Sequence, residues 1–360
     1  MAAVVLLVIV AGYATYGLWL NQLNGPNTLT VYTYATLFGG CDGSVTDGLM
    51  AQFDAAYGAH VQVDCLGGTL VSTLLAQKDA PTADVVVGLD EITAPQAAAD
   101  GLLLPYTPPG LADVNASLTA ALGPGNLATP YEWGYLAIDY NQSFAAATEG
   151  AVGRASFSNF SQNLTWADQL MIEDPTVDIT GEEFLLWEIA YEQSVAHANW
   201  QTFWQAVDGH VRVAPDWGDA FAAFQSPPDN PMMVVSYGTD PAYAAYAGAP
   251  GSFNATVSWS NGTPYGWQTV YGLGIVSGTQ HRTLAQEFVN WFLSPTVQSQ
   301  IPENEWEYPA NHTTPLPPEY AYAIDPAPVV ALNADLPPAT IVNDLPGWLD
   351  TWQSLANQAG

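Results

Sequence analysis

The sequence predicts an α/β protein with two lobes, each built on a doubly wound and mainly parallel sheet. From residue 29 onward, segments with strand patterns alternate with helical patterns. A Pro- and Gly-rich stretch over residues 105–130 separates a first series of these segments from a second. The 360 residues are enough for two hydrophobic cores. In sheets of this kind ligands bind beyond the carboxyl ends of the strands, so we expect a crevice there.

The first lobe begins with three predicted strands. Residues 29–38 alternate and are rich in β-branched and aromatic side chains, and residues 60–66 follow as a second strand. Residues 83–90 form a continuous apolar run, which is typical of a strand buried on both faces. Apolar residues at helical spacing predict helices over 47–57 and 69–77.

The second half of the chain starts with a strand-like segment over residues 131–141, which predicts a crossover into the second lobe. A helix follows at Thr180, and we expect it to open with a capping box formed by Thr180 and Glu183. The later expected elements are a buried strand over 232–236, a return strand over 271–278, a helix over 283–295 that Pro295 ends, and a terminal helix over 345–356.

These elements predict a domain order. The expected segments are an anchor or signal at 1–20, a tether at 21–27, the first part of lobe I at 28–130, lobe II at 131–262, a return into lobe I at 263–312, and a C-terminal extension with a terminal helix at 313–360.

Charge restricts the functions open to this chain. It holds 35 acidic and four basic residues, a formal net charge of −31. A nucleic-acid-binding face needs clustered Lys and Arg, so nucleic acid is excluded as a partner. Charged residues make up 11% of the chain against about 25% in ordinary domains, so Lys and Arg have been lost. This composition favours a protein that works in acidic surroundings over one that works at high salt. Three acid-labile Asp–Pro bonds argue against acidic surroundings.

The first twenty residues indicate where the protein lies. They carry no charged side chain and are long enough to span a bilayer. A cleaved signal would show a basic start and a small-residue cleavage site, and neither is clear. We therefore expect an uncleaved membrane anchor with the globular part outside the cell. Seven Asn-x-Ser/Thr sequons agree with this cell-surface location.

Cys41 and Cys65 are the only cysteines, and an even pair in an exported protein favours a disulfide over two free thiols. Cys41 follows the first predicted strand and Cys65 ends the second. If these strands are parallel neighbours, both cysteines lie at one edge of the sheet. A disulfide closing this loop would stabilise the fold by about 3 kcal/mol.

Five motifs follow one another along the chain: TVYTY at 30–34, ADVVVGLD at 83–90, WGYLAIDYN at 133–141, SYGTDPAY at 236–243 and IPENEWEYP at 301–309. Their order and spacing resemble those of the thiamine-binding proteins of bacterial and archaeal importers. The resemblance runs from about residue 29 to 308. It implies a two-lobed fold of the periplasmic binding protein type, an ABC permease as partner, no cofactor and no catalysed reaction.

The resemblance also implies a ligand held between the lobes by aromatic rings and by the loop after the SY strand. The matching positions in this chain are Tyr34, Trp217, Tyr237, Gly238, Thr239, Asp240, Tyr243 and Trp306. Thiamine has a thiazolium cation and a flat aminopyrimidine, which such rings bind by cation–π attraction and stacking. Asp240 would add a counter-charge. The alternative interpretation is that these aromatic side chains fill the core.

Two segments depart from the family pattern. The family has an acidic residue in the loop after the second strand, where this chain has Gly67, Gly68 and Thr69. The family also has a loop that suits a phosphate. In this chain the matching loop begins at Asp174, lacks the arginine of the family pattern and contains Asp178 in addition. We keep Gly68, Thr69 and Asp178 as candidate ligand contacts. We expect free thiamine or a related cationic heterocycle, because a phosphate needs donors or cations around it.

Two other functions fit the same fold. A ferric-ion carrier would recruit Tyr237, Tyr243 and Tyr246 as tyrosinate ligands, but would lack an arginine for a synergistic anion. A thiamine-cleaving enzyme uses a cysteine nucleophile, and both cysteines are expected to be paired. Glu182 and Glu183 are adjacent on a predicted helix and so do not form a glycosidase pair. No histidine pair has metal-ligand spacing.

Overall fold

The computed structural model describes residues 27–226 and 231–356. The predicted anchor over residues 1–20, and all of the predicted tether except its last residue, lie outside these ranges. Within the described part of the chain, no helix is both long and apolar enough to cross a membrane.

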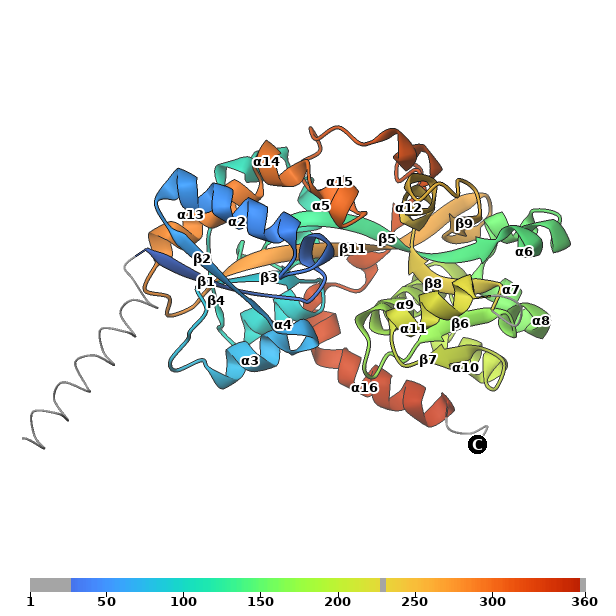
Figure 1. Ribbon diagram of the computed structural model, residues 1–360. Coiled ribbons are helices and arrows are strands. Elements are labelled where there is room, and N and C mark those ends of the chain that lie inside the picture. Colours follow the sequence, from blue (N-terminus) through green and yellow to red (C-terminus); the bar gives the residue numbers. More distant parts are fainter. Residues whose placement is uncertain (1–26, 227–230, 357–360) are drawn as a thin grey trace, which may run out of the picture.

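A single mixed sheet runs through both lobes in the order β2-β1-β3-β11-β5-β8-β6-β7. Its two longest strands, β5 (Thr129–Asn141) and β11 (Thr263–Val276), pair antiparallel to each other and connect the lobes. Figure 1 shows them running side by side across the middle of the molecule. The first lobe lies on the β3 side of this pair and the second lobe on the β8 side.

The strands of the first lobe are β1 (Thr28–Thr33), β2 (His60–Cys65), β3 (Val85–Leu89) and β4 (Leu103–Leu104). Those of the second lobe are β6 (Leu170–Glu173), β7 (Arg212–Ala214), β8 (Met233–Tyr237) and β9 (Phe253–Thr256). Three short strands, β10 (Ser258–Ser260), β12 (Tyr308–Pro309) and β13 (Val330–Ala331), join the sheet through β11 or β5.

The parallel pairing predicted from the sequence is right at both ends of the sheet and wrong in its middle. β1 is parallel to β2 and to β3, and β6 is parallel to β7 and to β8. The central pairs β3–β11, β11–β5 and β5–β8 are antiparallel. The chain must cross from one lobe to the other and return, and two strands that run in opposite directions achieve this.

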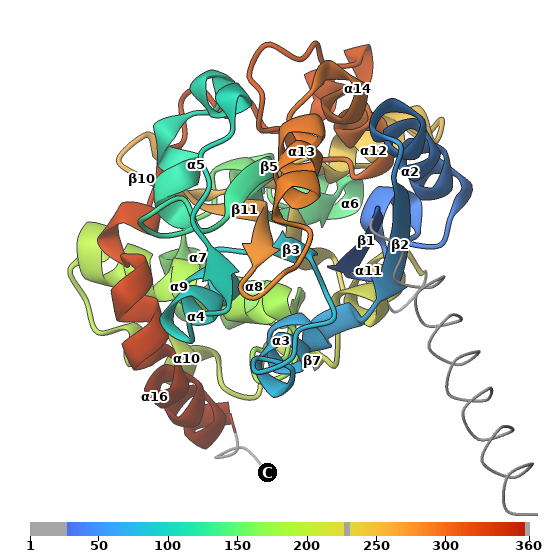
Figure 2. The same ribbon diagram turned by 90° about the vertical axis from the view of Figure 1, so that its left-hand side faces the viewer.

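Helices cover both faces of the first-lobe sheet. Helices α2 (Ser44–Tyr57) and α13 (Arg282–Phe292) pack with Val31, Val85 and Val87 on one face. Val86, which points the other way, packs with the helices of the opposite face. These are α3 (Leu70–Ala76), α4 (Thr93–Ala99) and α5 (Ala116–Ala121). This explains the continuous apolar run of β3, and Figure 2 shows β1, β2 and β3 between these helices.

The second lobe is built around α9 (Ile179–Tyr191), a helix that is buried along most of its length. The other helices of this lobe are α6 (Gln142–Ala147), α7 (Phe157–Gln162), α8 (Leu164–Ala167), α10 (Trp200–Val207), α11 (Trp217–Gln225) and α12 (Asp240–Tyr246). An aromatic core that includes Phe157, Phe184 and Trp187 holds α7 and α9 together.

The C-terminal segment ties the two lobes together. After α14 (Pro295–Gln298) and α15 (Ile301–Asn304), the chain reaches α16 (Pro338–Ala356). This helix contacts α4 of the first lobe and α10 of the second, where Trp352 and Trp204 lie 5.8 Å apart between ring centroids. Figure 1 shows α16 passing beneath both lobes.

Several element boundaries differ from those predicted. The first strand ends at Thr33, because the chain then turns through a 3-10 helix over Leu37–Gly39. The return strand β11 begins at Thr263, eight residues before its predicted start. Strands β6 and β7 were not predicted. Pro295 begins α14, whereas α13 already ends at Phe292. The predicted lobe borders at 130/131 and 262/263 fall within β5 and just before β11, and stay our proposal.

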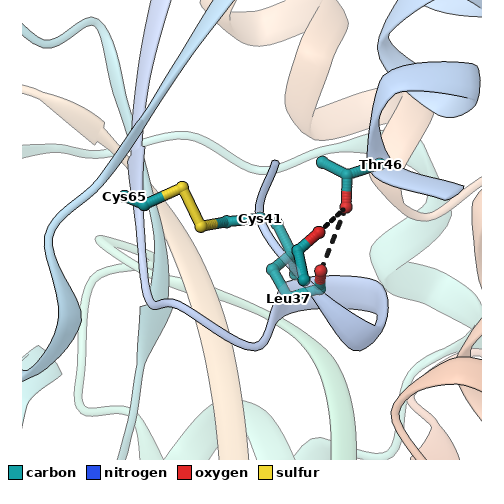
Figure 3. The surroundings of a disulfide bond; sticks show 5 residues. Leu37, Cys41, Thr46 and Cys65 are labelled. Carbon is teal, nitrogen blue, oxygen red and sulfur yellow. Dashed lines mark hydrogen bonds between the residues drawn. A yellow bond between two sulfur atoms is a disulfide. The ribbon is translucent and has the colours of Figure 1, made fainter. Parts of the chain in front are cut away.

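Cys41 and Cys65 form a disulfide with their Cα atoms 6.0 Å apart, at the end of the parallel β1–β2 pair (Figure 3). The Thr46 hydroxyl lies 3.0 Å from the carbonyl oxygen of Leu37 and 2.7 Å from that of Gly40. These contacts fix the turn that follows β1. Tyr34, a predicted ligand contact, begins this turn.

Candidate functional site

Trp217 and Tyr237 form an aromatic pair at the inner end of the second lobe. Trp217 is the first residue of α11, and Tyr237 is the last residue of β8. The Trp217 indole stacks on Phe221 at 5.2 Å and lies 6.3 Å from the Tyr237 ring. Its Nε1 donates a hydrogen bond of 2.9 Å to Ser236 Oγ. The indole is half-buried and fixed in place, so its remaining surface is available for stacking.

Asp178 connects the start of α9 to the start of α11. It is the N-cap residue of α9, and its carboxylate accepts hydrogen bonds from the backbone N–H of Thr180 at 2.9 Å and of Trp217 at 3.3 Å. The predicted capping box of Thr180 and Glu183 is therefore wrong: the helix starts one residue earlier, at Ile179. The Thr180 hydroxyl instead lies 3.3 Å from the Tyr237 hydroxyl.

Asp240 holds the turn after β8. Its carboxylate accepts hydrogen bonds from the Ser236 hydroxyl and, at 3.2 Å, from the Tyr237 N–H. Burial raises the pKa of Asp240 to about 6, although these hydrogen bonds act in the opposite direction. The adjacent Asp139 is fully buried, and its pKa is raised well above the usual range by burial and by the charge of Asp240. The Asp240 carboxyl thus points into its own turn.

Gly238 and Thr239 are buried beneath the C-terminal segment. The Gly238 N–H donates to the Tyr135 carbonyl, and the Gly238 carbonyl accepts from the Ile324 N–H, both at 2.8 Å. A Cβ on Gly238 would lie 3.0 Å from the Ile324 side chain, so a larger residue here would require this side chain to shift. The Thr239 hydroxyl is buried without a hydrogen-bond partner among the described residues.

Tyr243 and Trp306 bring α12 against the segment between α15 and β12. Their rings meet edge to face at 5.3 Å, and Tyr246 lies 4.9 Å from the same indole. Both tyrosines are exposed, and Trp306 is partly so. Trp306 has a φ of +58°, a left-handed conformation that is unfavourable for a bulky residue.

Tyr34 and Tyr271 continue the line of rings that begins with Trp217 and Tyr237. Their ring centroids are 6.2 Å apart, and the Tyr271 hydroxyl lies 3.4 Å from that of Tyr237. A Cβ on Gly88, where φ is +97°, would overlap with the Tyr34 ring, so this glycine makes room for the tyrosine. Tyr271 was not among the predicted contacts. Its position in the return strand, beside three glycines, is the signal that marks it.

Gly68 and Thr69 lie apart from these rings. They are exposed in the 3-10 turn Gly67–Thr69, where the Thr69 hydroxyl donates to the Leu66 carbonyl at 2.7 Å. In the part of the chain that the structure describes, neither residue hydrogen-bonds to the aromatic positions. Their assignment as ligand contacts stays a prediction.

Buried or partly buried carboxyl groups surround the rings, and sequence reasoning did not find them as a group. In each case burial is the first cause of a raised pKa, and in most of them neighbouring carboxylates raise it further. The residues are Asp90, Glu91, Glu132, Glu182, Glu183, Glu305 and Glu307. The available signal was an acidic residue inside an otherwise apolar segment, as at Glu132 and Glu183.

Glu91 and Glu183 form the most enclosed carboxyl pair. Glu91 accepts hydrogen bonds from Trp267 Nε1 at 2.7 Å and from the Val270 N–H at 3.1 Å, and burial raises its pKa to about 7. Glu183 is fully buried beside it, and neither carboxyl oxygen has a well-formed hydrogen bond among the described residues. Burial, and then the charges of Glu91 and Asp90, raise the pKa of Glu183 well above its usual range.

The basic side chains lie on the outside of the molecule. Lys78, Arg154, Arg212 and Arg282 are all exposed, and Arg154 lies 5.2 Å from the ring of Trp259. None of the carboxyl groups around the rings has its pKa lowered by a basic neighbour. A site with aromatic faces, carboxyl oxygens and no nearby basic group suits a cation better than an anion.

Two further observations restrict the site. A surface groove of about 440 Å³ lies between α2 and α14, but its lining includes no aromatic and no charged side chain. It does not offer the chemistry assembled around Trp217 and Tyr34. Among the described residues, no group of three or more His, Cys, Asp or Glu is arranged to hold a metal ion.

Comparison with known proteins gives relatives that share nearly the whole length. A thiamine-binding periplasmic protein of Brucella suis biovar 1 (strain 1330) is 26% identical over 336 residues, 91% of each chain. The protein of the same name from Escherichia coli (strain K12) is 26% identical over 329 residues, 90% of this chain and 92% of the relative.

Solved structures of related fold bind different ligands. A periplasmic thiamin binding protein superposes with a TM-score of 0.73 at 22% identity, covering 92% of this chain and 96% of that one. A ferric binding protein from Campylobacter jejuni gives a TM-score of 0.71 at 13% identity, covering 91% of this chain and 99% of that one. The family model described as bacterial extracellular solute-binding protein matches residues 42–299. The chain belongs to this family of extracellular solute-binding proteins.

Proposed function

We propose that this solute-binding protein captures thiamine, or a closely related cationic heterocycle, and delivers it to the permease of an ABC importer. The observation that carries the proposal is the line of rings from Trp217 through Tyr237 and Tyr271 to Tyr34. Carboxyl groups accompany it and the basic residues lie elsewhere. The names of the relatives from Brucella suis and Escherichia coli support the same ligand.

The chemistry of thiamine matches this set of residues. A thiazolium cation is attracted to the face of an aromatic ring by about 0.5–2 kcal/mol, and more when water is excluded. A flat aminopyrimidine stacks on a second ring. We place these contacts at Trp217, Tyr237, Tyr34, Tyr243 and Trp306. In this proposal Asp178 and Asp240 act by holding Trp217 and Tyr237 in position.

The same residues favour free thiamine over its phosphates. A phosphate group adds about −1.5 to −2 charges at neutral pH and needs cationic or N–H partners. The four basic side chains are exposed, and none of them lowers the pKa of a carboxyl group around the rings. Asp178 lies in the loop that matches the one suited to a phosphate in related proteins. Its carboxylate already accepts hydrogen bonds from the backbone N–H groups of Thr180 and Trp217.

A ferric-ion carrier is the weaker alternative. It would need tyrosinates at Tyr237, Tyr243 and Tyr246. Burial, followed by the charge of Glu183, raises the pKa of Tyr237 well above its usual value of 10, which opposes the tyrosinate form. The rings of Tyr243 and Tyr246 contact Trp306.

The proposal also covers where the protein lies in the cell and how its two lobes act. We propose that residues 1–20 anchor the chain and that the globular part faces the exterior, as the family name implies for related proteins. We further propose that lobe closure about β5 and β11 encloses the ligand and gives the permease a form to recognise.

A titration of the purified protein tests the ligand. We expect thiamine to quench tryptophan fluorescence and to bind more tightly at pH 7 than its monophosphate or diphosphate. Ferric citrate serves as the control for the iron-carrier alternative. Tight binding of ferric ion without binding of thiamine would replace this proposal, whereas tighter binding of the phosphates would correct the ligand form only.

A further inference from the structure

The segment around Trp306 has a strained backbone and directs two carboxyl groups into the interior of the protein. Trp306 adopts a left-handed conformation, and its ring turns toward Tyr243 at 5.3 Å. The residues on either side, Glu305 and Glu307, point inward. Glu305 Oε2 lies 3.0 Å from the Tyr34 hydroxyl, and its other oxygen accepts a hydrogen bond from a backbone N–H in the turn after β1.

Glu307 lies directly against the crossover strand β5. A Cβ on Gly134 would overlap with the Glu307 carboxyl, so the glycine provides the space that this carboxyl occupies. Gly134 lies in the stretch of β5 that pairs with β11 between the lobes. The Glu307 carboxyl therefore reaches the middle of the molecule, where a ligand held between the lobes would also lie.

Two oxygen atoms at this place have no partner. Oε2 of Glu132 and Oε2 of Glu307 are buried without a hydrogen bond among the described residues, and the two side chains are only 2% and 6% exposed. The other oxygen of Glu132 lies 3.4 Å from the Tyr34 hydroxyl. Buried polar atoms without partners are rare in native proteins, and each marks a place where a proton, a water molecule or a ligand belongs.

The group that would satisfy these atoms is an N–H donor. Glu132, Glu305 and Glu307 offer acceptor oxygens, and hydrogen bonds to carboxylates are the stronger ones when the donor carries positive charge. Burial, and then the neighbouring carboxylates, raise the pKa values of Glu132 and Glu307 by more than their hydrogen bonds to Tyr131, Tyr34 and the Tyr308 N–H lower them. The carboxyl groups in the described ranges do not form a metal-holding arrangement.

We propose that Glu132, Glu305 and Glu307, together with the Tyr34 hydroxyl, form a subsite that accepts hydrogen bonds from an amino group on the ligand's ring system. This inference rests on the proposed function and deepens it. In this arrangement the aromatic pair of Trp217 and Tyr237 binds the cationic ring, and the carboxyl subsite binds the ring that carries the amino group. An exocyclic amino group is then a condition for tight binding, in addition to positive charge.

Calorimetric titration of the wild-type protein separates this inference from the proposed function. The probes are thiamine and its 4′-oxo analogue, which keeps the thiazolium cation but replaces the amino group by oxygen. We expect the oxo analogue to bind at least ~10-fold more weakly, because an acceptor oxygen replaces the exocyclic amino donor that faces the carboxyl oxygens. Equal affinities would overturn the subsite and leave the proposed function standing. Failure of thiamine to bind at all would overturn both.

Single substitutions test which carboxyl groups recognise the amino group. Glu307→Gln keeps the shape and removes the charge, and we expect it to weaken thiamine ~10-fold and the oxo analogue less than ~2-fold. Glu305→Gln should act in the same direction. Glu303→Gln, an exposed change on α15, is the matched control and should leave both affinities unchanged. Thermal unfolding checks that the variants fold. Unchanged thiamine affinity in both Glu307→Gln and Glu305→Gln, or calcium binding that Glu307→Gln abolishes, would overturn the assignment.

Discussion

Two sets of carboxyl groups in the candidate site differ in their hydrogen bonds. On the second-lobe side, Asp178 and Asp240 accept backbone or hydroxyl hydrogen bonds and hold Trp217 and Tyr237 in place. On the crossover side, Glu132 and Glu307 keep oxygen atoms without partners. Hydrogen bonds to a carboxyl group favour its ionised form, whereas burial favours the protonated form, so the buried oxygen atoms without partners need a proton or a donor on a ligand.

The largest expected effect is a loss of stability as pH rises, and it comes from the burial of carboxyl groups. Burial raises the pKa of Glu91 from 4.5 to about 7 and that of Glu305 to about 8. Between pH 4.5 and these values the folded state holds protons that the unfolded state has released, so the free energy of unfolding falls as pH rises. For Glu91 alone the loss is about 3 kcal/mol.

Urea unfolding at pH 4, 6 and 8 measures this slope. Glu183→Gln should flatten it, because a neutral amide replaces the carboxyl that must otherwise ionise beside Glu91. The exposed Glu303→Gln should keep the wild-type slope. Stability that increases from pH 5 to pH 8 would contradict the raised pKa values of Glu91 and Glu305.

The disulfide tests whether stability and binding can be separated on the first-lobe side. Replacement of both Cys41 and Cys65 by Ser should lower the free energy of unfolding by about 3 kcal/mol, because a loop of 24 residues is no longer closed in the unfolded chain. Thiamine affinity should stay nearly the same, since Thr46 still holds the turn after β1. Thermal unfolding and a thiamine titration on the same sample give both values. A large loss of affinity would show that the disulfide itself positions Tyr34.

The aromatic pair on the second-lobe side should contribute affinity rather than stability. Trp217→Ala should weaken thiamine by about 1–3 kcal/mol, because the half-buried indole loses its stacking surface. Fluorescence or calorimetric titration measures the change. The matched control is Trp166→Ala on α8, which packs against Phe144 and Phe160 and should lower stability without changing affinity. If Trp217→Ala behaves like this control, Trp217 is a core residue.

The smallest predicted effect tests whether Asp178 only caps α9 or also positions a residue that contacts the ligand. Asp178→Ala should cost about 1 kcal/mol of stability, as should Asn199→Ala at the N-cap of α10. Only the change at Asp178 should also weaken thiamine, because its carboxylate holds the Trp217 backbone N–H. Chemical unfolding and titration of both variants test this. Equal thiamine affinities in the two variants would limit Asp178 to capping.

The sequence by itself determined which segments form the framework. Strand and helix patterns are local, since they reflect which side chains along a few residues face the core, and they placed β1, β2, β3, the start of the β5 crossover and α9. They failed for β6 and β7, because short strands carry too few residues to show a period. The cysteine pair and the aromatic positions were also visible in the sequence.

Tertiary structure alone decided how the site is assembled. Tyr34 meets Glu305 across 271 positions of the chain, and Glu91 meets the Trp267 indole across 176. No local pattern encodes such contacts, because they depend on the crossing of β5 and β11 and on the path of the C-terminal segment. The sequence shows the acidic residues; only the fold removes their solvent and sets them side by side, and desolvation is what gives them raised pKa values.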